Sequence, residues 1–138
     1  MKNEIILDFC IWEFEDITHD DITRMLGIQP IKVYIKGQKK SLKPSNFTKQ
    51  NGWRMGSTLD KYTSFEDQMN AMLDIIESKI DLFRLLSKKY YCEFSCALFI
   101  YYNNGESTPW VHLNSRYNRI IKELNIEFDV DIYCLPNE

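Results

Sequence analysis

Residues 5–14 read IILDFCIWEF, and this stretch limits the kind of fold that the chain can adopt. Both of its alternating sets are mostly apolar, one with Ile5, Leu7, Phe9 and Ile11, the other with Ile6, Cys10, Trp12 and Phe14. Successive side chains of a strand point to opposite faces, so the pattern predicts a central strand that is covered on both sides.

The residues after this strand predict a helix and a second strand. Thr18 can cap a helix, and Ile22, Met25 and Leu26 follow at helical spacing up to Gly27, a residue suited to a left-handed C-cap. Over residues 31–36, isoleucine and valine alternate with lysine and tyrosine, which indicates a strand with one face in water. The first unit therefore has the order β-α-β.

The middle of the chain predicts a long helix and a long strand. Apolar residues recur at helical spacing from Phe65 to Phe83, and we expect a break near Asp81, because an unbroken helix to Lys88 would span the whole domain. Residues 90–102 are apolar and aromatic on both alternating sets, which indicates a second long strand. The sequence Asn103-Asn104-Gly105 then predicts a hairpin turn, with residues 110–113 as the return strand.

The C-terminal part repeats the order of the first unit. A helix is predicted after Asn114, and residues 126–133 alternate as a final strand. The spacing Ile22-x-x-x-Leu26-Gly27-Ile28 also resembles Ile120-x-x-x-Leu124-Asn125-Ile126. These observations predict an α+β fold with a mixed or mainly antiparallel sheet, helices on one face, and two β-α-β-like halves around a central helix.

Length and composition favour one cytoplasmic domain over residues 1–138. The chain is 44% hydrophobic and 27% charged, as in ordinary globular proteins. Its N-terminus does not read as a secretory signal, and no apolar run is long enough to span a membrane. Cys10, Cys92, Cys96 and Cys134 lie within apolar, strand-like segments, so we expect reduced, buried thiols and neither a disulfide framework nor a zinc site.

Charge is unevenly distributed along the chain. Residues 22–59 contain no aspartate or glutamate and carry +8; because the whole chain carries −3, the remaining residues carry −11. Most of these cations fall in or beside a polar loop from Gly37 to Gln50. The binding residues we predict are Lys36, Lys39, Lys40, Lys43, Lys49, Trp53 and Arg54, with the last two as interface anchors.

No catalytic residue, metal ligand set or cofactor motif is identified in the sequence. The only histidines are His19 and His112, and the carboxylates of residues 13–21 lack the spacing of a calcium loop. An enzymatic alternative would use a pocket near His112, with Tyr101 and a carboxylate such as Glu93.

Several short features together resemble a bacterial family, domain of unknown function 4279. They are the early strand, the Leu26-Gly27-Ile28-x-Pro30 step, Gly37, Trp53 after the basic loop, the helix over residues 65–76 and the ending over residues 126–133. The resemblance covers nearly the whole chain. It implies a fold and a bacterial source, and it carries no catalytic residues.

These observations predict a non-catalytic, protein-binding domain that uses the basic loop. The expected partner is an acidic protein, in the manner of small bacterial immunity or accessory proteins. Two alternatives stay open: the enzyme with a pocket near His112, and a domain that binds an anion or nucleic acid through residues 36–54. Nucleic acid is the less favoured ligand, because the acidic remainder of the chain would repel phosphates. The sequence does not determine the oligomeric state.

Overall fold

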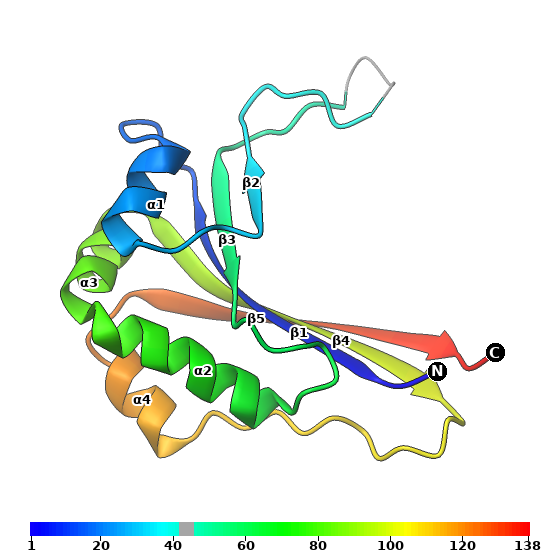
Figure 1. Cartoon of the computed structure of the whole chain (residues 1–138). Coiled ribbons are helices and arrows are strands. Elements are labelled where there is room, and N and C mark those ends of the chain that lie inside the picture. Colours follow the sequence, from blue (N-terminus) through cyan, green and yellow to red (C-terminus); the bar gives the residue numbers. More distant parts are fainter. Residues whose placement is uncertain (42–45) are drawn as a thin grey trace.

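The computed structural model describes residues 1–41 and 46–138. It forms a mixed α+β fold in which the helices cover one face of a sheet, as predicted (Figure 1). In chain order the elements are β1 (Glu4–Trp12), α1 (His19–Leu26), β2 (Lys32–Tyr34), β3 (Gly52–Gly56), α2 (Phe65–Ser78), α3 (Ile80–Lys89), β4 (Tyr91–Tyr102), α4 (Ser115–Ile121) and β5 (Ile126–Pro136).

The strands lie in the order β2-β3-β1-β4-β5. The β4–β5 pair is parallel and every other pair is antiparallel. The C-terminal half is a β-α-β unit, because α4 connects two adjacent parallel strands. In the N-terminal half β3 lies between β1 and β2, so the two halves resemble each other only in part.

The core lies between the sheet and the helices. The residues of β1 that face the helices include Leu7, Phe9 and Ile11, all buried, and the Phe9 ring meets Phe83 of α3 edge to face at 5.4 Å. On the opposite face, which we call the open face, Asp8 and Cys10 are also buried. The first strand is therefore central and buried on both sides at its middle, although helices cover only one of its faces.

The predicted long helix is interrupted, close to the expected position. Helix α2 ends at Ser78 and α3 begins at Ile80, with Lys79 in a non-helical conformation between them. Gln68 of α2 is buried, where its Nε2 donates to the Ile5 carbonyl at 2.8 Å and its Oε1 accepts from the Leu7 amide. This polar contact fixes α2 against the end of β1.

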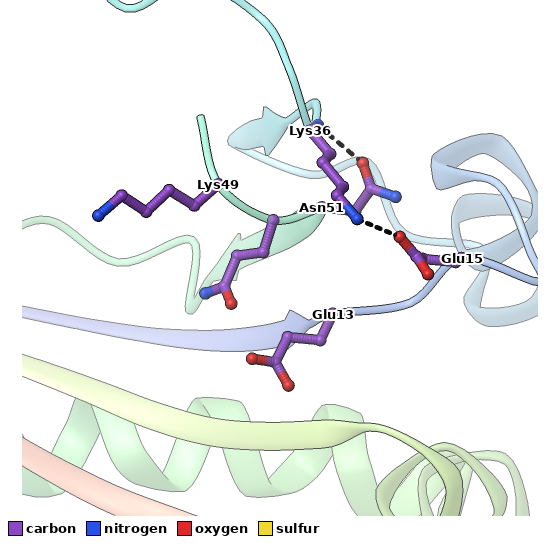
Figure 2. A pocket seen from close by; sticks show the side chains of 6 residues that line it. Glu13, Glu15, Lys36, Lys49 and Asn51 are labelled. Atoms are coloured by element: carbon purple, nitrogen blue, oxygen red, sulfur yellow. Dashed lines mark hydrogen bonds and ion pairs between the residues drawn. The ribbon is translucent and has the colours of Figure 1, made fainter. Parts of the chain in front are cut away.

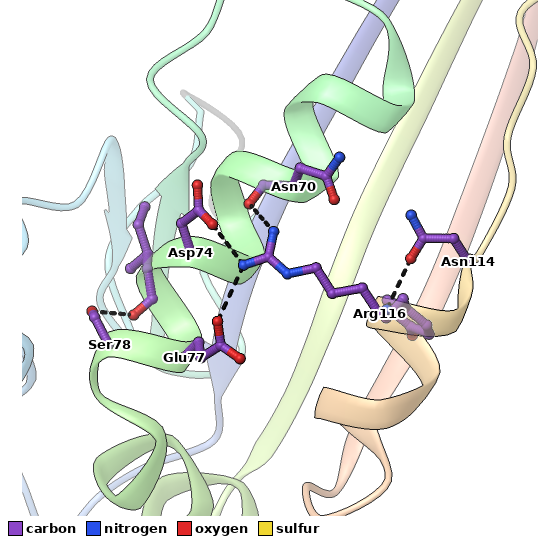
Figure 3. A network of polar contacts seen from close by, with 8 residues as sticks. Asn70, Asp74, Glu77, Ser78, Asn114 and Arg116 are labelled. Carbon is purple, nitrogen blue, oxygen red and sulfur yellow. Dashed lines mark hydrogen bonds and ion pairs between the residues drawn. The ribbon is translucent and has the colours of Figure 1, made fainter.

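Arg116 connects α4 to α2 (Figure 3). Its guanidinium donates to Asp74 at 2.6 Å, to Glu77 at 3.3 Å and to the Asn70 carbonyl at 3.3 Å. Asn114 caps the same helix by accepting from the Tyr117 amide. Helix α4 is short, so these contacts and its buried face fix its position.

Three local predictions were wrong. Residues 110–113 form no strand, because the chain returns from β4 to α4 along the helix side of the sheet (Figure 1). The strand predicted over 31–36 covers only Lys32–Tyr34. Cys134 is exposed, since the last residues of β5 extend past the helices.

Candidate functional site

The described residues of the predicted basic loop bond to each other across an extension that contains one isolated bridge, between Lys39 and Phe47. We call residues 35–41 and 46–51 the basic arm. Within it the Gly37 amide donates to the Thr48 carbonyl, the Thr48 amide to the Gln38 carbonyl, and the Lys40 amide to the Asn46 carbonyl, each at 2.8 Å. Figure 1 shows the arm projecting beyond the end of the sheet.

Asn51 joins the root of the arm to the end of β1. Its Oδ1 accepts from the Lys36 amide at 2.9 Å, and its Nδ2 donates to the Phe14 carbonyl at 2.7 Å. Its carbonyl accepts from the Glu13 amide at 2.9 Å. These three bonds fix the direction in which the arm leaves the sheet.

Lys36 is already neutralised within the protein. Its ammonium contacts Glu15 at 2.6 Å, and this charge-assisted hydrogen bond raises the lysine pKa. The two residues line a shallow cavity of about 250 Å³ together with Glu13, Lys49 and Asn51. In Figure 2 the Lys36 side chain points to Glu15, whereas Lys49 extends away from both glutamates.

The other described lysines of the arm have no such partner. Lys39, Lys40 and Lys49 are exposed and make no ion pair with any residue that the structure describes. Lys39 and Lys40 line a cavity of about 420 Å³ along the arm, and Lys40 and Lys49 line an adjoining one of about 320 Å³. Tyr34, Lys40 and Thr48 line both cavities. The free cations therefore gather around one aromatic residue of β2.

Trp12 and Tyr34 form an aromatic floor beneath these lysines. Their ring centroids lie 5.0 Å apart, and both side chains are half-buried on the open face. Gly52 makes the arrangement possible, because a Cβ at this position would come within 2.3 Å of the Trp12 ring. No sequence signal identifies Trp12 or Tyr34 as site residues.

Arg54 supports the floor from the neighbouring strand. Its guanidinium donates to Asp8 at 2.8 Å and lies 5.9 Å from the centre of the Tyr34 ring. Burial raises the Asp8 pKa, and the Arg54 guanidinium opposes that rise. Arg54 Nε is buried without an acceptor among the described residues. Arg54 is thus engaged by Asp8 within the protein, and its predicted role as an interface anchor stays a prediction.

Trp53 does not reach the surface. Its side chain is fully buried, and its Nε1 donates to Thr23 of α1 at 3.1 Å. The alternation of β3 directs it toward the helices, opposite to Arg54. The prediction that Trp53 anchors an interface is therefore wrong for this fold, in which it is a core residue. Lys43, the remaining predicted residue, lies outside the described residues.

The far side of the open face is acidic. Glu127, Asp129 and Asp131 of β5 are exposed there, and Glu93 of β4 lies beside them. Burial raises the pKa of Glu93, and the nearby Asp129 carboxylate raises it further. The open face is thus basic at the β2 side and acidic at the β5 side.

Neither histidine lies in a catalytic arrangement. His112 is exposed, contacts the Trp110 ring and lines none of the three cavities around the arm. Tyr101 instead contacts Glu4, and Glu93 accepts from Trp12 Nε1. His19 donates to the Tyr34 carbonyl at 2.8 Å and packs on Phe14, so it holds β2 in place.

The described part of the chain contains no cluster of three or more histidine, cysteine or carboxylate side chains that could hold a metal ion. Among the same residues, no helix has both the length and the apolar character needed to cross a membrane.

In a comparison with known proteins, the chain matches a family whose description assigns no activity. The family model described as "Domain of unknown function (DUF4279)" matches residues 3–135, nearly the whole chain. No curated protein matches the chain, and no solved structure matches it.

Proposed function

The chain belongs to the family described as Domain of unknown function (DUF4279), and since that description assigns no activity, we propose a function from the geometry of the basic arm. The protein is a non-catalytic binding domain over residues 1–138 that holds an acidic segment of a protein partner. Such a domain would act like small bacterial immunity or accessory proteins. Free, buried thiols at Cys10, Cys92 and Cys96 suit a reducing compartment such as the cytoplasm.

One observation supports this proposal most directly. Lys39, Lys40 and Lys49 lack ion-pair partners among the described residues, yet they gather around cavities walled by Tyr34. Unpaired lysines at the mouth of a cavity attract carboxylates, and an aromatic wall adds apolar contact area at little entropic cost. A segment that carries carboxylates and an apolar or aromatic side chain fits both features.

The charge pattern of the open face favours a protein over a nucleic acid. Exposed Glu13 and Glu15 line the same cavity as Lys36, and the β5 side carries three further carboxylates. A continuous phosphate backbone that crossed this face would meet repulsion within a few residues. A folded partner can instead place carboxylates on the arm and keep its remaining surface neutral or basic.

The proposal is tested by capture from a lysate of the source organism on three immobilised baits. These are the native protein, Lys39→Glu with Lys40→Glu, and a matched control, Lys88→Glu with Lys122→Glu. The control makes the same change in net charge at two exposed lysines, one in α3 and one just after α4, that have no ion pair with a described residue. Each lysate is used with and without nuclease, and thermal melting checks that every bait is folded.

We expect a protein that is retained by the native and control baits, is lost with the arm variant and is insensitive to nuclease. With that partner purified, the arm variant should bind roughly tenfold more weakly or worse, about 1.4 kcal/mol or more. Equal retention by all three baits would contradict the role of the arm.

A second candidate ligand is single-stranded nucleic acid, because Trp12 and Tyr34 beside free lysines resemble a stacking platform. Retention that disappears with nuclease, together with direct binding of a random oligonucleotide that weakens steeply with salt, would support this candidate and overturn the protein partner.

A further inference from the structure

Strand β5 leaves a long edge of the sheet that pairs with no other strand in the described part of the chain. It spans eleven residues, pairs in parallel with β4, and is the last strand in the sheet order. Figure 1 shows it continuing past the helices toward the C-terminus. An unpaired edge presents a row of backbone N–H and C=O groups, which is a template for another extended chain.

The two sides of this edge have different chemistry. Val130 and Ile132 point to the helix side, yet they are 41% and 61% exposed because no helix covers them. Glu127, Asp129 and Asp131 alternate with these residues and lie on the open face. Proteins commonly protect an edge with charged side chains, proline or a bulge. In β5 the three carboxylates and the terminal Pro136 have this effect, so an occupant of the edge must bring complementary cations. Over residues 126–132 the β5 edge therefore offers apolar and acidic side chains in alternation.

A second copy of the chain fits this edge poorly. Pairing two β5 strands about a twofold axis would place carboxylates of one copy against those of the other, and like charges opposite each other destabilise a strand pair. Strand β2 of another copy has the complementary pattern but spans three residues, so it would leave most of the β5 edge bare. The charge and length of the edge therefore favour a different protein as its occupant.

We propose that the β5 edge binds an extended segment of a partner protein in which lysine or arginine alternates with apolar residues. Backbone hydrogen bonds would supply affinity, and the alternating side chains would supply specificity. The cations of the segment face Asp129 and Asp131 on the open face. The apolar residues cover Val130 and Ile132 on the helix side. This site is separate from the basic arm, which lies beyond the opposite side of the sheet.

The test uses synthetic peptides and the full chain. The probe is a nine-residue peptide that alternates lysine and valine. The first control peptide has the same composition with the lysines in one block, and the second is the alternating peptide with methylated backbone nitrogens. Protein variants are Asp129→Lys with Asp131→Lys, and a matched control, Asp20→Lys with Glu66→Lys, at exposed helical positions. Binding is measured by fluorescence anisotropy, and amide exchange over residues 126–136 locates it.

We expect the alternating peptide to bind the native and control proteins, to protect amides of β5, and to bind the Asp129/Asp131 variant at least roughly tenfold more weakly. An alternating glutamate–valine peptide should show the opposite preference. The Lys39/Lys40 arm variant should bind the probe as the native protein does, which separates this site from the proposed function.

Equal binding of the block peptide, or undiminished binding of the methylated peptide, would overturn the proposal, because charge alone would then explain the affinity. Sedimentation velocity tests whether a second copy of the chain binds the β5 edge instead. Self-association of the native chain that is lost in the Asp129/Asp131 variant would show that a second copy fills the edge, and would also overturn the proposal.

Discussion

The two edges of the sheet are built in different ways. On the β2 side, a three-residue strand is held by specific side-chain contacts: His19 bonds its backbone, Arg54 and Trp12 flank Tyr34, and Asn51 fixes the adjoining arm. On the β5 side, an eleven-residue strand pairs with β4 along its whole length. There the side chains beyond Phe128 make few internal contacts and are mostly exposed.

The two edges therefore differ in whether the same residues serve both folding stability and ligand recognition. On the β2 side, residues that support the candidate site are also structural, so their substitution would change both properties. On the β5 side, the backbone ladder supplies the stability, and the exposed side chains can be changed with little effect on the fold. Four substitutions test this contrast, and the one with the largest expected effect lies in the core.

The largest effect should come from Trp53→Ala in β3. Removal of this fully buried side chain leaves a cavity and leaves the Thr23 hydroxyl without its hydrogen bond from Trp53. We therefore expect a loss of about 3–5 kcal/mol in the free energy of unfolding. Urea denaturation measures it. Trp110→Ala is the matched control, because Trp110 is 64% exposed and its loss should cost only about 0.5 kcal/mol. Similar small losses at both positions would contradict the burial of Trp53.

Arg54→Met should produce a loss that depends on pH. Without the guanidinium, the buried Asp8 carboxylate has no counter-charge, and we expect a loss of about 3 kcal/mol at pH 7. The Asp8 pKa, already raised by burial, should rise further, because Arg54 supplies the influences that lower it. The variant is therefore destabilised least below pH 3.8, the ordinary pKa of aspartate, and increasingly as the pH rises through the raised pKa.

Urea denaturation from pH 4 to pH 8 checks this expectation. The control adds Asp8→Asn to Arg54→Met, which removes the titrating group and should flatten the pH dependence. A loss in the single variant that is constant across this range would show that Asp8 is not the group responsible.

Asn51→Ala should loosen the arm with a smaller effect on the fold. Two side-chain hydrogen bonds disappear, and we expect a loss of about 1–2 kcal/mol. The amides of Gly37 and Thr48, which bond across the arm, should exchange faster with solvent. Asn118→Ala, at an exposed position of α4, should leave those amides unchanged.

The smallest effect on stability should come from Ile132→Thr on the β5 edge. The side chain is 61% exposed, and threonine keeps the β-branched shape. The free energy of unfolding should therefore change by no more than about 0.5 kcal/mol. Binding of the alternating lysine–valine peptide should nevertheless weaken measurably. A large loss of stability without a change in binding would reverse the contrast between the edges.

Much of the fold could be predicted because its signals are local. The doubly apolar pattern of residues 5–14 correctly predicts a central strand with buried residues on both faces, and Thr18 and Gly27 correctly bound α1. Asn103-Asn104-Gly105 correctly predicts a turn, but the return strand predicted after it is absent. A turn signal does not specify whether the chain pairs again.

The candidate site was only partly predictable. The run of lysines is visible in the sequence, and Lys39, Lys40 and Lys49 do line adjoining cavities. Which lysine is free depends on distant partners, and Lys36 is neutralised by Glu15, which lies 21 positions earlier. Both Trp12 and Trp53 lie in strands, but the first is half-buried on the open face and the second lies in the core.

Local sequence was enough to establish the strands and helices with strong periodicity, the segregation of basic residues into one window, and the absence of recognisable catalytic motifs. The order of the strands emerged only in the folded chain, and with it which strands became edges and which side chains met across them. The physical reason is that periodicity and capping act within a few residues, whereas strand order and ion pairing depend on contacts between segments far apart in the chain.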